Sequence, residues 1–526
     1  MSSDPSEKVK ALPMRILLIN PPYITFTSRF GVGHQVPLGL LMVGGALLDR
    51  GHNVELLDAE RRHLKASAII REVRAFAPHI VMAGHAGSTP AHPICIEMLS
   101  AIKRSCPEVT TVYGGVYPTY HAEEILTAEA AVDFIVRGEG EETVVGLVAA
   151  IECGESSQRE HRQVAVRTLP LAYSNSVPAT TSLQSVRGIS YRVDGRIAHN
   201  PDGLPIADLD GYRSAWELIT NWDDYQCFGL GRAAIVQFSR GCPHRCTYCG
   251  QHGFWVNWRH RDPVRLVDEI EWLYRTHGVR FCTIADENPT TIRPLWQRFL
   301  EEMASRRLPV KFFATIRATD IVRDADILPL YREAGLLYVL MGIESTDPEV
   351  LKEIKKGSTT RHDFLACRLL KQHGVYSVLG HIVGLEDDSW AGLRAALKQL
   401  KHYEGDYLNA MYVTPHSWTE FGRAAAGRRI VEPDQQKWDY RHQVLEQPKL
   451  TPWQLFFGVK LLELRFHLRA AKLRALFASN RFSRRQVMWG LSHSGLVWLA
   501  EIGEFLSAGL RAARREPANQ VRSIDP

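Results

Sequence analysis

The sequence lacks any apolar segment long enough to cross a membrane. Its longest nearly uncharged apolar stretch, from Val36 to Leu48, has the length of a buried helix. The opening residues, MSSDPSEKVKALP, contain no apolar stretch of the signal-peptide type and predict a disordered tail over residues 1–13. We therefore expect neither a transmembrane segment nor a secretion signal.

A strong charge imbalance and a disulfide framework are also absent. The 526 residues carry a formal net charge of only +5, so we expect no nucleic-acid partner, which would need basic residues concentrated on one face. The nine cysteines are scattered apart from one cluster, which argues against a secreted disulfide protein and favours the reducing cytoplasm. The hydrophobic content of 45% is that of a soluble globular protein, and the length predicts two or three domains.

Residues 14–150 alternate between strand and helix patterns. Strands are predicted at 14–20, 54–58, 80–84 and 109–113, with helices at 38–50, 66–76 and 93–105 between them. Helical crossovers of this size predict an α/β domain with a doubly wound parallel sheet covered on both faces. Ligands in such sheets lie beyond the carboxyl ends of the strands.

A second series of strands and helices follows a change of composition. Residues 151–230 are predicted as a linker that contains a hairpin at 188–200. Residues 231–415 contain six strand–helix units, which predict a partial (β/α)6 barrel with functional loops after its strands. Residues 416–515 are predicted as a helical region and 516–526 as a tail. The amphipathic helices of the region 416–515, at 453–475 and 487–513, are expected to pack on the protein body, with attachment to a membrane surface as the alternative.

One cysteine cluster carries the strongest chemical signal. Cys242, Cys246 and Cys249 follow the first predicted barrel strand in the pattern C-x3-C-x2-C, with no fourth cysteine close behind. Thiolates ligate iron–sulfur clusters, and a four-iron cluster normally takes four of them, so three leave one iron open to another ligand. Zinc is the alternative, but only His244 and His252 are near enough in sequence to complete such a site. The pattern therefore predicts a 4Fe–4S cluster with one open iron.

The cysteine pattern, with Tyr248 before the last cysteine, resembles that of the radical S-adenosylmethionine (SAM) superfamily. The resemblance covers about residues 233–412. It implies that the open iron binds the amino and carboxylate groups of SAM, which an electron from the cluster cleaves to a 5′-deoxyadenosyl radical. The SAM-binding residues that it implies are Tyr248, Asp286, Glu287, Arg317, Glu344, Gly380, Ile382 and Gly384. For Arg317 and Glu344 a structural salt bridge is the alternative.

The amino-terminal domain resembles the cobalamin-binding, flavodoxin-like domain that often precedes this barrel. The resemblance rests on Asn20-Pro21-Pro22, on G-H-A-G-S-T from Gly84, on G-G-x-x-P-T from Gly114 and on R-G-E-G-E-E from Arg137. The cobalamin-binding residues that it implies are Asn20, Pro21, Ser88, Thr89, Gly114, Gly115 and Glu139. A flavodoxin-like domain without cofactor is the alternative.

The D-x-H-x-x-G element that supplies a histidine to cobalt in methionine-synthase-type domains is absent. The nearest histidines, His34, His63 and His85, do not lie in that context. A lone histidine in a loop after a strand is more often a hydrogen-bonding residue than a ligand. The hypothesis is that cobalt has no lower ligand from the protein.

Within this fused class, the barrel most closely resembles the anaerobic magnesium-protoporphyrin IX monomethyl ester oxidative cyclases. The resembling stretches include F-W-V-N-W-R-H-R-D-P from Phe254, I-A-D-E-N-P-T from Ile284 and H-I-V-G-L-E from His381. The resemblance implies a tetrapyrrole substrate, bacteriochlorophyll biosynthesis, and an electron donor such as ferredoxin or flavodoxin. Candidate substrate neighbours are Trp255, Trp258, His260 and His381, with packing as the alternative for the tryptophans.

Two other functions stay open. A cobalamin-dependent radical C-methyltransferase would have the same domain order and the same cofactors, and the cluster motif does not separate it from a cyclase. A cobalamin sensor without catalysis is more remote, because a sensor does not need the adenine- and ribose-binding strand ends.

Overall fold

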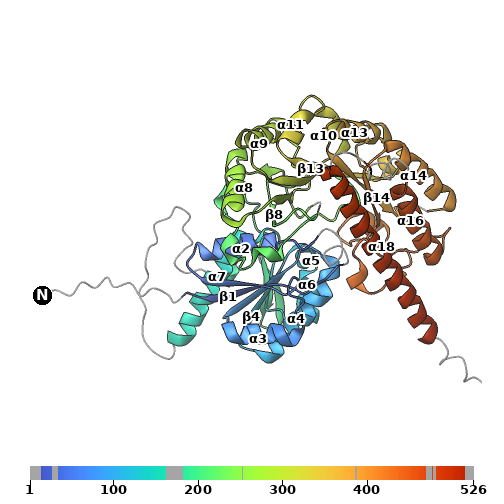
Figure 1. Ribbon diagram of the computed structural model, residues 1–526. Helices are drawn as coiled ribbons and strands as arrows, with labels where there is room; N and C mark the ends of the chain where they lie inside the picture. Colours follow the sequence, from blue (N-terminus) through green and yellow to red (C-terminus); the bar gives the residue numbers. More distant parts are fainter. Residues whose placement is uncertain are drawn as a thin grey trace, which may run out of the picture.

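The computed structural model describes residues 13–25, 33–160, 182–251, 253–385, 388–469, 477 and 481–515. Some predicted features lie outside the described residues: residues 1–12 and 516–526 of the tails, the end of the helix 453–475, and the candidate zinc ligand His252. Figure 1 shows the amino-terminal domain in blue and cyan against a larger barrel in green to orange, with the carboxy-terminal helices at the side of the barrel.

A seven-stranded sheet forms the amino-terminal domain, in the order β2-β1-β3-β4-β5-β6-β7. The parallel strands are β1 (Arg15–Asn20), β2 (Asn53–Asp58), β3 (Ile80–Gly84), β4 (Thr110–Gly114) and β5 (Phe134–Val136). The helices are α2 (Leu38–Leu48), α3 (Ala66–Phe76), α4 (His92–Ser105), α5 (Val116–Tyr120), α6 (Ala122–Ala128) and α7 (Gly140–Glu160). Alternate residues of β1 enter two different hydrophobic cores, Leu17 on one face and Leu18 on the other, which confirms a sheet covered on both sides.

The hairpin predicted within the linker is part of this sheet instead. Strands β6 (Ile189–Val193) and β7 (Arg196–His199) pair with each other, and β6 also pairs antiparallel with β5. Ile189 and Tyr191 are buried in the same core as Val136, and this burial draws the hairpin onto the sheet edge. The helix before it, α7, also runs past the predicted domain end at residue 150.

Six parallel strands in sequence order form the partial barrel. They are β8 (Ala233–Val236), β11 (Phe281–Ile284), β12 (Lys311–Thr315), β13 (Leu336–Glu344), β14 (Tyr376–Val383) and β15 (Tyr407–Tyr412). The helices are α8 (Pro263–His277), α9 (Arg293–Arg306), α10 (Ala318–Arg323), α11 (Leu328–Glu333), α12 (Pro348–Glu353), α13 (Thr360–Gln372) and α14 (Trp390–Tyr403). A short antiparallel pair, β9 (Ser239–Arg240) and β10 (Arg259–His260), lies after the first barrel strand.

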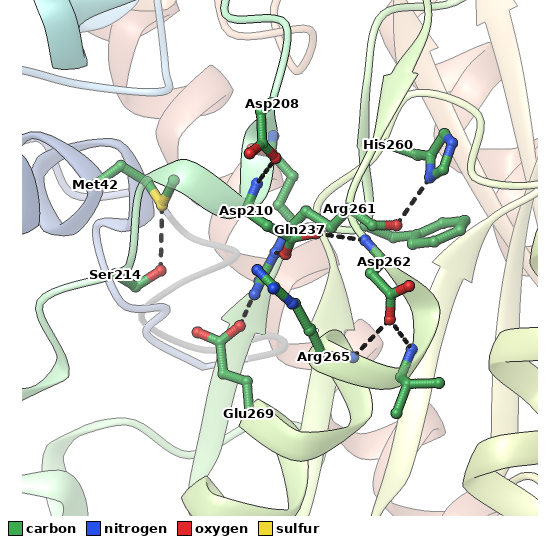
Figure 2. Close-up of polar contacts among 12 residues, drawn as sticks. Met42, Asp208, Asp210, Ser214, Gln237, His260, Arg261, Asp262, Arg265 and Glu269 are labelled. Carbon is green, nitrogen blue, oxygen red and sulfur yellow. Dashed lines mark hydrogen bonds and ion pairs between the residues drawn. The ribbon is translucent and has the colours of Figure 1, made fainter. Parts of the chain in front are cut away.

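The segment before the barrel is fixed to the first barrel helix. Figure 2 shows Arg261 between Asp210 and Glu269, with 2.9 Å from its Nε to the Asp210 carboxylate. Asp262 caps α8 by accepting the Val264 N–H at 2.8 Å. The main core also joins Leu41 of the amino-terminal domain to barrel residues, so the two domains share buried apolar surface.

The carboxy-terminal region is only partly helical. Between α15 (Glu420–Ala424) and α16 (Pro452–His467) the chain is largely irregular, which differs from the predicted helical region. Helix α16 packs on α14 and β15, as predicted, and its Lys460 forms a buried ion pair with Glu463 at 2.7 Å and with Glu501 of α18 (Arg481–Arg515). No helix within the described ranges combines the length and apolar character that a membrane span requires.

Candidate active site

The cysteine loop follows the first barrel strand, β8, and the short strand β9. Cys242 comes two residues after β9, and Cys246 and Cys249 follow with no disulfide among them. Gly241 before them has φ +92°, and a Cβ there would lie 2.2 Å from the Asn257 carbonyl oxygen, so the position requires glycine. Cys246 is buried, whereas Cys242 and Cys249 are half-buried and remain accessible.

The described residues form no site for a single metal ion, and the zinc candidate His252 is not among them. Among the residues that the structure describes, no three His, Cys, Asp or Glu side chains lie close enough to share one metal ion. In a four-iron cluster each cysteine binds a different iron, so the three thiols need not meet at one point.

Two adjacent carboxylates after β11 have different partners. Asp286 accepts hydrogen bonds from the Phe238 N–H at 2.9 Å and from the Ser239 hydroxyl, so both its oxygens hold the segment that leads to the cysteines. Glu287 accepts a hydrogen bond from the backbone of Gly241, but its Oε2 is buried and unpartnered within the described part of the chain. Burial raises the pKa of Asp286 to about 8 and that of Glu287 to about 7. Glu287 therefore has an unsatisfied acceptor beside the cluster loop.

A buried ion pair between Glu344 and Lys356 lies at the end of β13, next to Arg317, which follows β12. Glu344 accepts a hydrogen bond from Lys356 Nζ at 2.7 Å, and Tyr248 bonds to the same carboxylate. Arg317 donates to the Lys356 carbonyl through Nη2, while its buried Nε has no partner among the described residues. The structural salt bridge considered for Glu344 is therefore present, whereas Arg317 keeps one donor for a further acceptor.

Two glycines of neighbouring strands lie next to this ion pair. Gly380 of β14 pairs in register with Gly342 of β13, and a Cβ on Gly380 would lie 3.6 Å from the Gly342 Cα. Gly384 has φ +92°, and Ile382 between the two predicted glycines is half-buried. Paired glycines let a flat ring approach the backbone closely, which fits the adenine of SAM.

The predicted substrate neighbours divide into two groups. The Arg240 guanidinium lies over the ring of Trp255, 5.0 Å from its centroid. Trp258 donates its indole N–H to the Asn288 carbonyl at 3.1 Å, and His260 Nδ1 lies 2.9 Å from the Arg261 carbonyl. These three side chains are engaged within the protein. His381 differs, since it is buried and its Nδ1 has no partner in the described part of the chain; burial lowers its pKa to about 4.

Three of the predicted cobalamin-binding residues use their side chains within the protein. Asn20 donates to the Asp58 carboxylate of its own domain at 2.8 Å. Thr89 and Glu139 bond to residues beyond the amino-terminal domain. The Thr89 hydroxyl lies 3.0 Å from the His416 imidazole, and Glu139 accepts a hydrogen bond from the Arg240 guanidinium at 2.7 Å. Their side chains contribute to the domain interface.

The other four predicted residues lie at the carboxyl edge of the amino-terminal sheet. Pro21 follows β1, and Gly114 ends β4, with Gly115 next at φ +115°. Ser88 has φ +57°, and its Oγ is buried without a partner among the described residues. Small residues at adjacent strand ends, together with one unsatisfied hydroxyl, fit a flat macrocycle such as cobalamin.

The histidines near this edge are held by other groups. Nδ1 of His85 accepts the Gly87 N–H at 2.7 Å, and its Nε2 lies 3.2 Å from Glu60. His34 lies 4.0 Å from the same glutamate, and its ring packs edge-on against that of His63 at 5.5 Å. Both ring nitrogens of His85 are engaged, so neither is available to cobalt.

Sequence reasoning missed the ion pairs that join the two domains. Arg240, directly before the cysteine loop, is 2% exposed and binds both Glu139 and Glu141. Arg259 adds a second guanidinium to Glu139 at 2.7 Å. The R-G-E-G-E-E motif marked these glutamates, but it did not show that their partners lie in the barrel. The polar residues His416 and Tyr440 beside the last cysteine were missed as well.

Comparisons with known proteins agree with this geometry. The model of the radical SAM superfamily matches residues 236–400, and that of the B12 binding domain matches residues 31–148. An anaerobic magnesium-protoporphyrin IX monomethyl ester cyclase from Synechocystis sp. is 45% identical over 90% of this chain and 90% of its own length. The protein of the same name from Rubrivivax gelatinosus is 30% identical over 90% of this chain and 81% of its own.

The fold is that of a solved enzyme with both cofactor domains. The radical SAM methyltransferase TsrM from Kitasatospora setae, solved with cobalamin and a 4Fe–4S cluster, superposes with a TM-score of 0.65 at 14% identity, covering 93% of this chain and 100% of its own. The two family models imply a 4Fe–4S cluster, SAM and cobalamin as cofactors. The chain is a radical SAM enzyme and belongs to the family of anaerobic magnesium-protoporphyrin IX monomethyl ester cyclases.

Proposed function

We propose that this enzyme closes a ring on a tetrapyrrole, magnesium-protoporphyrin IX monomethyl ester, without using oxygen, as a step of bacteriochlorophyll biosynthesis. The observation that carries the proposal is the 45% identity to a cyclase of that name, which extends over both cofactor domains. An identity of this size along nine tenths of both chains includes the segments between the cofactor motifs, where a substrate would bind.

The barrel residues would divide the binding of cluster and SAM among them. Cys242, Cys246 and Cys249 would ligate three irons. The unsatisfied oxygen of Glu287 suits the ammonium group of SAM, and the free donor of Arg317 suits its carboxylate. The cluster and SAM together supply a 5′-deoxyadenosyl radical, and the protein supplies position and exclusion of water.

The amino-terminal domain would hold cobalamin at the carboxyl edge of its sheet. Ser88 offers a buried hydroxyl there, and Gly114 and Gly115 offer bare backbone. Because both nitrogens of His85 are engaged, we propose that the cobalt has no lower ligand from the protein. An electron paramagnetic resonance spectrum of the Co(II) form with nitrogen splitting from a protein imidazole would contradict this.

The second candidate is a cobalamin-dependent C-methyltransferase. The observation in its favour is that the methyltransferase TsrM has the same two domains over its whole length. Both candidates need the same three cofactors, so neither the cysteine loop nor the sheet edges separate them.

A product assay separates the two candidates. The enzyme is purified without oxygen, its cluster is reconstituted, and it is incubated under reduction with SAM, cobalamin and the magnesium porphyrin ester. A cyclase yields 5′-deoxyadenosine and a cyclised porphyrin, whereas a methylase yields S-adenosylhomocysteine alongside 5′-deoxyadenosine. A methylated product with S-adenosylhomocysteine would replace the leading proposal with the second.

We also propose the reducing cytoplasm as the compartment and a ferredoxin or flavodoxin as the electron donor. The cysteines of the chain form no disulfide in the described residues, and an oxygen-sensitive cluster suits the same compartment. Turnover that depends on added flavodoxin or ferredoxin, with the natural reductase, would test the donor.

A further inference from the structure

A hydrogen-bonded chain of three side chains crosses the domain boundary close to the cysteine loop. His416, four residues after β15, has Nδ1 at 3.0 Å from the Thr89 hydroxyl and Nε2 at 2.8 Å from the Tyr440 hydroxyl. Thr89 belongs to the amino-terminal domain, whereas His416 and Tyr440 belong to the segment after the barrel. Thr89 and His416 are each 2% exposed, so the bond between them is shielded from solvent.

The His416 imidazole lies beside Gly250, the residue that follows the last cysteine of the loop. Trp418 stacks on His416 with 4.6 Å between ring centroids and donates its indole N–H to the Gly250 carbonyl at 2.8 Å. Gly250 follows Cys249, and a Cβ on Gly250 would approach the His416 ring to 3.1 Å. The cysteine loop and the hydrogen-bonded chain are therefore packed against each other.

Tyr440, at the end of this hydrogen-bonded chain, is more exposed than the two residues before it in that chain. The residue is 42% exposed, yet burial among surrounding atoms raises its pKa, and the nearby Cys249 thiol acts in the same direction. Its other neighbours, His416 and Tyr23 of the amino-terminal domain, are almost completely buried. An exposed tyrosine next to two such buried neighbours, one from each side of the domain boundary, points to a recess beside Tyr440 at that boundary.

The backbone at Tyr440 is strained. Its φ is +66°, a conformation that bulky residues rarely adopt. The Tyr440 carbonyl accepts the Tyr412 N–H at the end of β15 at 2.8 Å, which fixes the strained residue to the barrel. Strain of this kind persists where the surrounding structure holds a side chain in one position, and it gathers at functional sites.

The tautomer of His416 sets the direction of these two hydrogen bonds. Burial lowers the pKa of His416 to about 4, so the imidazole is neutral, with one donor and one acceptor nitrogen. In one of its two neutral tautomers, Nδ1 accepts a hydrogen bond from the Thr89 hydroxyl, and we assign this tautomer. This assignment puts the ring proton on Nε2, which donates to the Tyr440 oxygen, and leaves the Tyr440 proton to be donated into the recess.

We propose that Tyr440 is a substrate-binding residue, whose hydroxyl donates a hydrogen bond to a carbonyl oxygen of the substrate in an orientation set by His416 and Thr89. The inference rests on the proposed function, since the proposed substrate carries an ester carbonyl. A carbonyl bound by Tyr440 would lie near the cysteine loop, since Cys249 is close enough to act on the pKa of Tyr440. Thr89 and His416 are positioning residues, because they act on the substrate through Tyr440.

The test compares two tyrosines that both lie near Cys249. Tyr440→Phe removes only the hydroxyl of the proposed donor. Tyr120→Phe is the matched control, because Tyr120 also lies near Cys249 and stacks on Trp418 at 5.0 Å, but its buried hydroxyl has no partner among the described residues. Each variant is loaded with cluster and cobalamin and titrated with magnesium-protoporphyrin IX monomethyl ester by absorbance.

In Tyr440→Phe we expect wild-type cluster absorbance and cobalamin content, a dissociation constant for the porphyrin raised about tenfold, and less cyclised product per 5′-deoxyadenosine formed. Tyr120→Phe should match the wild type in all four measurements. An unchanged dissociation constant and an unchanged product ratio in Tyr440→Phe would overturn the inference.

The positioning role has its own readout. Thr89→Val removes the hydroxyl that sets the imidazole tautomer, and Thr89→Ser keeps it. We expect Thr89→Val to lower the product ratio and Thr89→Ser to restore it, which a purely structural contact would not do. Equal ratios in the two variants would reject the positioning role. Failure of the wild-type enzyme to bind or convert the porphyrin would instead count against the proposed function itself.

Discussion

The carboxyl edges of the two parallel sheets contain similar residues but use them differently. At the barrel edge, Glu287 and Arg317 each keep a buried polar atom without a partner among the described residues. At the edge of the amino-terminal sheet, Asn20, Thr89 and Glu139 are bonded to other parts of the protein. Both edges face a cofactor in this class of enzyme, but the barrel edge keeps two charged side chains with a free polar atom, whereas the amino-terminal edge keeps only the Ser88 hydroxyl among its predicted residues.

The difference follows from what each cofactor offers. SAM carries an ammonium and a carboxylate, which need charged partners in a shielded site. A corrin ring is large and flat, and we propose that glycines and one hydroxyl at the strand ends receive it. The charged groups of the amino-terminal edge are then available to join the domains, and Glu139 and Glu141 do so through Arg240.

The largest expected effect concerns the cluster, without which the barrel edge has no function. We expect Cys246→Ala to abolish the brown cluster absorbance and to reduce 5′-deoxyadenosine formation to the level of a sample without enzyme, because a cluster loses one of its three protein ligands. The control is Cys153→Ala, which removes an exposed cysteine of α7 and should change neither. Retained activity in Cys246→Ala would end the assignment of the cysteine loop.

The next effect concerns the interface role of the amino-terminal edge. Arg240→Ala leaves Glu141 buried without its cation and weakens the pairing of Glu139, so we expect the free energy of unfolding to fall by about 3–5 kcal/mol in urea titrations. Lys371→Ala, which breaks the exposed pair with Glu404, should cost no more than about 1 kcal/mol. Equal losses in the two variants would mean that the buried pairs do not hold the domains together.

A smaller effect separates the adjacent carboxylates of the barrel edge. Glu287→Gln removes the charge beside the cluster loop, and we expect SAM to bind about 10- to 100-fold more weakly while the cluster absorbance is unchanged. Asp286→Asn disturbs the hydrogen bonds to Phe238 and Ser239, so it should lower cluster content and leave the SAM affinity of the loaded fraction unchanged. Equilibrium dialysis of SAM against each reconstituted variant measures both quantities.

Much of the fold could be predicted from the sequence because its signals are local. Strands such as β1 and β14 are short apolar runs followed by glycine or proline, and the cysteine spacing is fixed by the geometry of the cluster that it serves. Strand β5, with three residues, is too short for such a signal, and its pairing with the hairpin was missed for that reason.

The parts of the site that could not be predicted depend on contacts between distant residues. Glu139 and Arg240 are 101 positions apart, and Thr89 and His416 are 327 apart. No spacing rule relates such pairs, so a motif can mark a residue as important without showing which domain it serves. The same limit applies to Asp286 and Glu287, since only the structure shows which of two neighbouring carboxylates has a free oxygen.

The smallest effect tests the comparison within a single loop of the amino-terminal edge. Ser88→Ala removes the buried hydroxyl that has no partner in the described residues, and we expect cobalamin to bind about tenfold more weakly with the free energy of unfolding nearly unchanged. Thr89→Val removes the bond to His416 and should lower the free energy of unfolding by about 1 kcal/mol without changing cobalamin affinity. Cobalamin titration and urea unfolding of both variants measure the two effects. A loss of cobalamin affinity in Thr89→Val as large as in Ser88→Ala would show that this edge serves cofactor and interface with the same residues.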